Sequence, residues 1–175
     1  MGEIANIGTG IRNTIDGLTE GRYPFFVRSQ EVRFMDSYDF DEIAIITSGD
    51  GVGVGKIFHY IQGKYALHQR AYRIVIKDSG VIAKFFYHYM KNSFEQYILK
   101  TAVYASVTSV RMPMLLLYPV PIPPLEEQER IVAILDKFDA LVNDISLGLP
   151  AELKARRKQY EYYRNKLFTF KEKVA

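Results

Sequence analysis

The stretch EIAIITSGDGVGVGKIFHYIQG, residues 42–63, decides the fold. It opens with the apolar, β-branched run of a strand, and a second run, KIFHYI, carries the aromatic and β-branched residues of another. The four glycines between the runs allow positive φ angles or a close approach of the backbone to a neighbour. The stretch therefore predicts a strand, a loop and a second strand.

The glycine-rich loop, residues 48–56, does not match the two common phosphate-binding patterns. The pattern G-x-x-x-x-G-K-[ST] requires glycine where this chain has Asp50, and Ser or Thr where it has Ile57. The pattern G-x-G-x-x-G requires glycine where it has Lys56. Both patterns also begin a helix, whereas a strand is expected here. Two interpretations stay open: an ordinary hairpin loop, and a loop that lies against the backbone of a ligand.

The first part of the chain predicts a mixed α+β domain. Further strands are expected at residues 23–28 and 70–76, with a tight reversal at Gln62–Lys64. Between Val81 and Leu99, apolar residues recur near a 3.6-residue period, which predicts one helix or two short ones. The chain changes character at Tyr118–Gln128, and every later pattern indicates helix. We therefore expect a globular domain at residues 1–123 and a helical region at residues 124–175.

In the helical region, Pro123 and Pro124, followed by acidic residues, predict a helix start near Leu125. Apolar residues then follow at spacings of three and four, as in the seam of a coiled coil. The phase of this seam slips at Gly148 and Pro150, where we expect a kink; a tight helical hairpin is the alternative. Roughly collinear helices would form a rod of about 70 Å whose seam needs another helix. The predicted dimerisation residues are Ile131, Ile134, Phe138, Leu141, Ile145, Leu153, Tyr160, Tyr163 and Leu167.

The composition excludes several classes of site. The chain has no cysteine, which excludes disulfides, Cys-based zinc sites and thiol catalysis. Its three histidines lack the spacing of metal ligands, and no G-x-S-x-G motif is present, so we expect neither a metal nor catalytic residues. No window resembles a signal peptide or reaches the ~18 to 20 apolar residues of a membrane span. A cytoplasmic protein is expected.

The charge distribution and two polar stretches point to DNA. Residues 43–123 carry nine Lys or Arg against three Asp or Glu, and such an excess attracts polyanions. The stretches VRSQEVRF, residues 27–34, and ALHQRAYRI, residues 66–74, contain the Arg and Gln side chains that pair with guanine and adenine edges. A lysine and two hydroxyl residues are expected at phosphates, namely Lys56, Thr108 and Ser109. The predicted DNA-binding residues are Arg28, Ser29, Gln30, Arg33, Lys56, His68, Gln69, Arg70, Thr108 and Ser109.

Two helical segments resemble those of a known family. PIPPLEEQERIVAILDKFDAL, residues 121–141, followed by LKARRKQYEYYRNKL, residues 153–167, closely resembles the conserved helical region of the specificity (S) subunits of type I restriction-modification systems. Upstream, GEIANIGTG, ALHQRAYRI and SVTSVRMPMLLLYPVPIPP are similar to the start, middle and end of a target-recognition domain in that family. The resemblance covers almost the whole chain.

The resemblance implies a non-catalytic subunit that recognises double-stranded DNA. Catalysis is then expected on methyltransferase and restriction partner subunits, which would hold S-adenosylmethionine, ATP and Mg²⁺, with no cofactor in this chain. Members of the family alternate two recognition domains with two helical regions, whereas this chain has one of each. We therefore expect an antiparallel homodimer that presents two domains to a bipartite site, about one helical turn of ~34 Å apart. A coiled-coil adaptor that does not read DNA and a small nucleotide-dependent enzyme are the alternatives.

Overall fold

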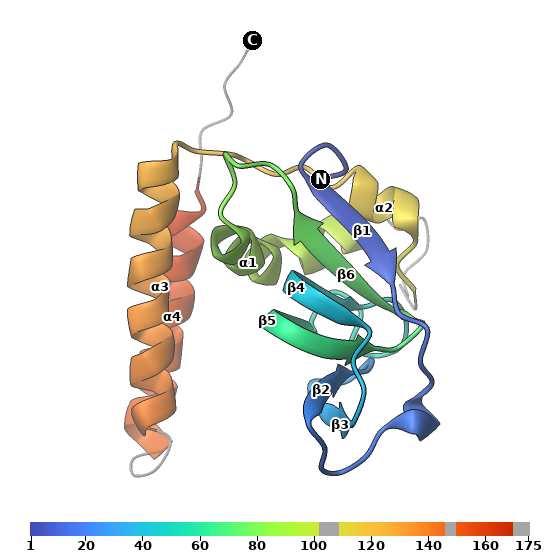
Figure 1. The fold of residues 1–175 in the computed structure, drawn as a ribbon. Coiled ribbons are helices and arrows are strands. Elements are labelled where there is room, and N and C mark those ends of the chain that lie inside the picture. The colour runs from blue at the N-terminus through green and yellow to red at the C-terminus, as the bar shows by residue number, and fades with distance from the viewer. Residues whose placement is uncertain (102–108, 146–149, 170–175) are drawn as a thin grey trace. The chain divides into compact units, whose positions relative to one another are not determined.

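The computed structural model describes residues 1–101, 109–145 and 150–169. The chain divides into two compact units, Met1–Val120 and Pro121–Ala175. The first unit is built on a β-sheet with helices, and the second consists of two helices (Figure 1). The expected α+β fold class is therefore confirmed.

The sheet of the first unit contains six strands in the order β1-β6-β4-β5-β2-β3. Neighbouring strands are antiparallel except for β2 and β5, which are parallel. The strands are β1 Ala5–Thr9, β2 Tyr23–Phe26, β3 Arg33–Met35, β4 Phe40–Ser48, β5 Phe58–Leu67 and β6 Ala71–Ile76. The strand, loop and strand predicted from residues 42–63 are thus β4, the glycine-rich loop and β5.

Two apolar clusters pack on strand β4, one on each of its faces. Successive side chains of a strand point to opposite faces, so Ile45 joins one cluster while Ala44 and Ile46 join the other. Helix α1, Ala83–Thr101, supplies the first cluster with a row of buried residues that includes Phe86 and Phe94. Two short helices complete this unit: η1, Thr14–Asp16, and α2, Met112–Leu116. The helix predicted between Val81 and Leu99 is therefore confirmed as α1.

The predicted reversal at Gln62–Lys64 is wrong. Strand β5 continues through these residues and pairs with β4 on both sides of Gly63. Gly63 has a φ of 115°, a conformation that glycine adopts without strain, so the strand accommodates it without ending. The chain reverses further on, where the N–H of Ala71 donates to the carbonyl of His68 at 3.0 Å. This shift moves the candidate residues Gln69 and Arg70 into a turn.

The second unit contains helices α3, Leu125–Ile145, and α4, Pro150–Leu167. The predicted start at Leu125 is confirmed. The Phe138 ring stacks on the Tyr163 ring at 5.8 Å, and it meets the Tyr160 ring edge-on at 6.3 Å. In a collinear rod, the 1.5 Å rise per residue would place Phe138 and Tyr163 about 37 Å apart.

The two helices therefore lie side by side as a hairpin, and the predicted 70 Å rod is wrong. Part of the apolar seam of α3 packs on α4 of the same chain, which removes the need for a second chain along that part. The phase slip at Gly148 marks the connection between the helices, but residues 146–149 lie outside the described residues. The side chains of Leu141, Ile145 and Leu153, which were also predicted for the seam, lie outside the described part as well.

Phe94→Ala should lower the free energy of unfolding by about 3 to 5 kcal/mol, since it empties a buried position between two aromatic rings. Phe94 is fully buried and meets the rings of Phe58 and Tyr118 edge-on at 5.9 and 5.0 Å. Because the chain contains no tryptophan, urea unfolding is best followed by far-ultraviolet circular dichroism. Val52→Ala, at a fully exposed position, is the matched control with no expected change. A loss below 1 kcal/mol for Phe94→Ala would contradict this packing.

Candidate nucleic-acid interface

Four loop segments meet around the turn between β5 and β6. They are the segment after β1, the loop after β2, the glycine-rich loop and the turn itself, residues 68–70. Backbone hydrogen bonds join them directly: Gln69 N–H to Arg12 O at 2.9 Å, His68 N–H to Phe26 O at 3.0 Å, and Gly49 N–H to Arg70 O at 2.9 Å. Loops far apart in the sequence are therefore held as one surface by their main chains.

Gly49 is required for the close contact between the glycine-rich loop and the turn. A Cβ atom at this position would lie 2.5 Å from the carbonyl oxygen of Arg70, well inside van der Waals contact. The expectation that these glycines allow a close backbone approach is met here, and Gly51 and Gly55 in the same loop have φ angles of 83° and 76°. The backbone that Gly49 approaches is that of the turn between β5 and β6 in the same chain.

Asp50 connects two of the predicted DNA-binding residues. Its Oδ1 accepts a hydrogen bond from Nη1 of Arg28 at 2.8 Å, and its Oδ2 accepts one from Nη1 of Arg70 at 3.0 Å. Partial burial of the carboxyl opposes its ionisation, but the hydrogen bonds and positive charges of the two arginines outweigh it and lower the pKa of Asp50. The Asp50 carboxylate is therefore charged at neutral pH. We call Arg28, Asp50 and Arg70 the Asp50 triad.

The other residues of the turn differ in their access to a ligand. Gln69 is exposed, and its Nε2 donates to Oδ1 of Asn13 at 2.5 Å. His68 is only 4% exposed, and its Nδ1 accepts a hydrogen bond from the N–H of Arg70 at 3.0 Å. Burial, with the nearby charge of Arg28, lowers the pKa of His68, so its ring is neutral at pH 7. His68 thus shapes the turn, while Gln69 and Arg70 face outward.

The loop after β2 lies beside the Asp50 triad and, together with the first residue of β3, holds four predicted residues, all exposed. Arg28 belongs to the triad, and the Ser29 hydroxyl donates to the carbonyl of Glu31 at 2.8 Å. Nη1 of Arg33 donates to the carbonyl of Thr14 at 3.0 Å, while Gln30 is exposed next to Ser29. A cleft of about 500 Å³ opens between this loop, η1 and the glycine-rich loop.

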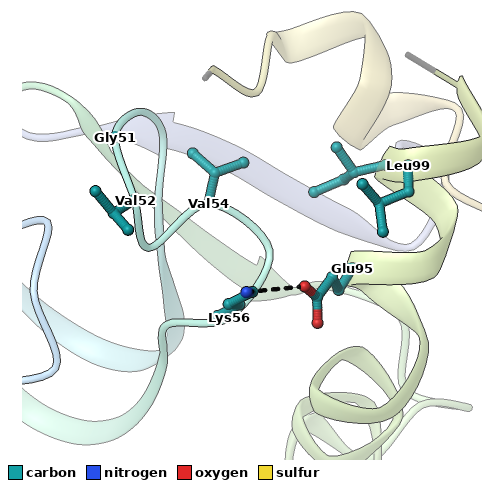
Figure 2. A pocket seen from close by; sticks show the side chains of 7 residues that line it. Gly51, Val52, Val54, Lys56, Glu95 and Leu99 are labelled. Atoms are coloured by element: carbon teal, nitrogen blue, oxygen red, sulfur yellow. Dashed lines mark ion pairs between the residues drawn. The ribbon is translucent and has the colours of Figure 1, made fainter. Parts of the chain in front are cut away.

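Lys56 lies apart from the triad and faces helix α1. Figure 2 shows its ammonium group pointing to the carboxylate of Glu95, at 3.3 Å. The two side chains line a pocket of about 340 Å³, together with Gly51, Val52 and residues of α1. Lys56 is well exposed, but its charge is already opposed by Glu95 in the free protein.

The two remaining predicted residues are Thr108 and Ser109. Ser109 is exposed and forms an isolated β-bridge with Asp50. Next to it, the N–H of Val110 donates to the carbonyl of Gly49 at 2.8 Å. Ser109 therefore lies at the base of the Asp50 triad, whereas Thr108 lies outside the described residues.

Sequence reasoning did not select Asp50, Arg12 or Asn13 for this surface. Asp50 was considered only as a departure from a phosphate-loop pattern. The nearest arginines in the sequence, Arg33 and Arg70, are 17 and 20 residues away, so no local pattern indicates its ion pairs. Arg12 and Asn13 contact Gln69 of the turn, more than 50 residues away in the sequence, and no local sequence pattern predicts these contacts. One exposed apolar side chain, that of Val52, also lines the cleft.

Two other kinds of site were searched for among the described residues. No group of three or more His, Asp or Glu side chains within residues 1–101, 109–145 and 150–169 could hold a metal ion. None of the helices in those ranges has both the length and the apolar character needed to cross a membrane.

Comparison with known proteins gives one consistent family. Over 100 residues, 56% of this chain, the sequence is 45% identical to the type I restriction enzyme EcoR124I/EcoR124II specificity subunit of Escherichia coli. It is 33% identical over 132 residues, 75% of this chain, to the type I restriction enzyme MpnII specificity subunit of Mycoplasma pneumoniae. The chain spans only 24% and 38% of those two subunits.

Solved structures show the same fold at low sequence identity. The crystal structure of an S subunit from M. genitalium matches 98% of this chain, and 45% of its own length, with a TM-score of 0.65 and 15% identity. The HsdS subunit of Thermoanaerobacter tengcongensis matches 95% of this chain, and 43% of its own, with a TM-score of 0.59 and 17% identity. The sequence profile of the type I restriction modification DNA specificity domain matches residues 1–155. This chain therefore belongs to the family of type I restriction-modification specificity subunits.

Proposed function

We propose that the chain is a non-catalytic subunit that recognises a DNA sequence within a type I restriction-modification complex. The observation that supports this most directly is the surface around the turn between β5 and β6, where Arg28, Gln69 and Arg70 are exposed on loops joined by backbone bonds. Guanidinium and amide groups are the donors that distinguish guanine and adenine in the major groove. The chain thus presents suitable hydrogen-bond donors on loops whose backbones are hydrogen-bonded to one another.

Contacts to base edges and contacts to phosphates would come from different residues. We assign Gln69 and the arginines of the Asp50 triad to base edges, since they project from the turn and the loops beside it. Lys56 and Ser109 are assigned to phosphates, with Thr108 as a further candidate. Because Lys56 already pairs with Glu95, a phosphate would have to replace that carboxylate.

A second copy of this chain would supply the second recognition domain. The chain spans 24 to 45% of the length of the specificity subunits compared above, and a symmetric dimer would read a bipartite, symmetric site. On the hairpin, the side chains of Ile134, Phe138, Tyr163 and Leu167 line a groove of about 570 Å³, together with Glu127, Arg130, Lys166 and Thr169, and a second copy could fill this groove. The groove replaces the rod seam as the dimerisation surface. Of the other predicted residues, Ile131 and Tyr160 are buried.

The chemistry would belong to partner subunits. A methyltransferase subunit would bring S-adenosylmethionine, and a restriction subunit would bring ATP and Mg²⁺. This chain would contribute the choice of DNA site and a surface on which those subunits dock. Co-expression with a methyltransferase subunit, followed by mapping of methylated adenines, gives the target site directly.

Gln69→Ala should reduce discrimination at one base pair by about 1 to 3 kcal/mol, because it removes a base-edge contact. Lys56→Ala should weaken binding to every sequence alike and flatten the salt dependence, because it removes a phosphate contact. Both effects are measured by titrating the full chain with the mapped site and with random duplex. Gln62→Ala and Lys77→Ala, at exposed positions outside these loops, are the matched controls. Equal losses on both duplexes for both variants would refute the division of roles.

The dimer predicts a sedimenting mass of about twice the 20.2 kDa of one chain at micromolar concentration. Ile134→Asp should yield a monomer, since it places a charge among the apolar side chains of the groove. Ala133→Asp adds the same charge at the adjacent, exposed position and should leave the dimer intact. A wild-type chain that sediments as a monomer would exclude this mode of association.

A further inference from the structure

The Asp50 triad joins two loops that are separate in the sequence. Arg28 follows β2 and Arg70 precedes β6, and each donates one Nη to a different oxygen of the same carboxylate. A guanidinium group has five N–H donors, so most donors of each arginine stay available. The side chains of Arg28 and Arg70 are 40% and 64% exposed, whereas that of Asp50 is 22% exposed. The carboxylate of Asp50 is thus the most buried of the three groups, and the two arginine side chains are more exposed to solvent.

The main chain fixes the position of Asp50. The Ser48 hydroxyl donates to its backbone carbonyl at 2.7 Å, and its backbone bridges to Ser109. On the preceding residue, Gly49 bonds to Arg70 through the backbone. A carboxylate held in this way can restrain both arginines before any ligand binds, which lowers the entropy cost of binding.

The distances within the triad suit neighbouring base pairs. The two bonded nitrogens lie within roughly 8 Å of each other, because hydrogen bonds of about 3 Å join each to one carboxylate. Adjacent bases along a DNA strand are about 3.4 Å apart, so two steps fit within this span. Arginine pairs bidentately with O6 and N7 of guanine.

We infer that Asp50 is a positioning residue that sets Arg28 and Arg70 as a pair to read two guanines at adjacent or next-adjacent base pairs; the inference rests on the proposed function. A carboxylate at a DNA-binding surface repels phosphates, and this repulsion acts on every sequence. Asp50 therefore lowers affinity for DNA in general while it raises discrimination by restraining the arginines. A residue with a structural role alone would have neither of these opposite effects.

Asp50→Asn separates the two effects. The variant removes the repulsion and releases both arginines to phosphates, so affinity for random duplex should rise about 2- to 10-fold with a steeper salt dependence. At the same time, the preference for guanine at the two positions should fall about 5- to 100-fold. The measurement is selection of the full chain on a randomised duplex pool, followed by competition titrations with the selected and random duplexes.

Two further variants serve as controls. Asp50→Glu keeps the charge and should recover part of the guanine preference. Asp41→Asn removes one negative charge from an exposed position at the other end of β4 and should leave the preference unchanged. Thermal unfolding by circular dichroism checks that each variant is folded. A ¹³C NMR titration of wild-type protein should place the pKa of the Asp50 carboxyl below the ordinary aspartate value of about 3.9.

The outcomes distinguish this inference from the proposed function. A wild-type chain that selects no sequence overturns the proposed function, and the inference falls with it. A wild-type chain that selects a sequence without guanine at such spacing overturns the inference alone. So does a folded Asp50→Asn variant that keeps its full preference, or one that loses affinity equally on selected and random duplexes. An ordinary pKa at Asp50 would show that the triad is not formed in solution.

Discussion

The pairing of Ser48 with Ala71 is the constraint on which the candidate interface depends. This antiparallel register ends β4 opposite the start of β6, so the next residues outward, Gly49 and Arg70, must face each other. Their backbones bond at 2.9 Å, and only the absence of a side chain on Gly49 permits it. One residue further, Asp50 reaches both arginines. A shift of register by one residue would turn the side chains of β4 to the opposite faces and separate these loops.

The parts of the fold that could be predicted are those set by local pattern. The β-branched and aromatic runs within residues 42–63, with glycines between them, predicted two strands and their loop, and Pro123 with Pro124 predicted the start of α3. The turn after β5 was misplaced because Gly63 reads locally as a turn, while pairing on both sides keeps it in a strand. The hairpin was not favoured because a connection of only Gly148 and Leu149 is at the lower limit of loop length. The apolar seam could not decide between the two, since it looks the same whether its partner lies in the same chain or in another one.

The candidate site was predictable in its side-chain chemistry but not in its pairing. The arginines and glutamine were chosen because their donors suit base edges, whereas their partners, Asp50 and Asn13, come from other loops. The count of positive charges along the sequence also overestimates the positive electrostatic potential that a DNA molecule would meet. Lys56 is opposed by Glu95, and Arg73 by Glu42, at 3.3 and 2.9 Å. Glu95 is already counted among the three acids of residues 43–123, so only the pairing with Glu42 lowers the excess of six positive charges there, by one.

The main-chain bonds that join the four loops have a consequence for how such a protein can change. They link Gln69 to Arg12, His68 to Phe26 and Gly49 to Arg70 without using the exposed side chains of these segments. This backbone part of the loop arrangement is therefore independent of the identity of the residues that face outward, whereas the Asp50 triad and the bond between Gln69 and Asn13 depend on it. On the proposed function, substitutions at positions such as Gln30 would alter the DNA preference while the backbone bonds persist. Backbone bonding of this kind would then let one fold present different sets of base-reading side chains.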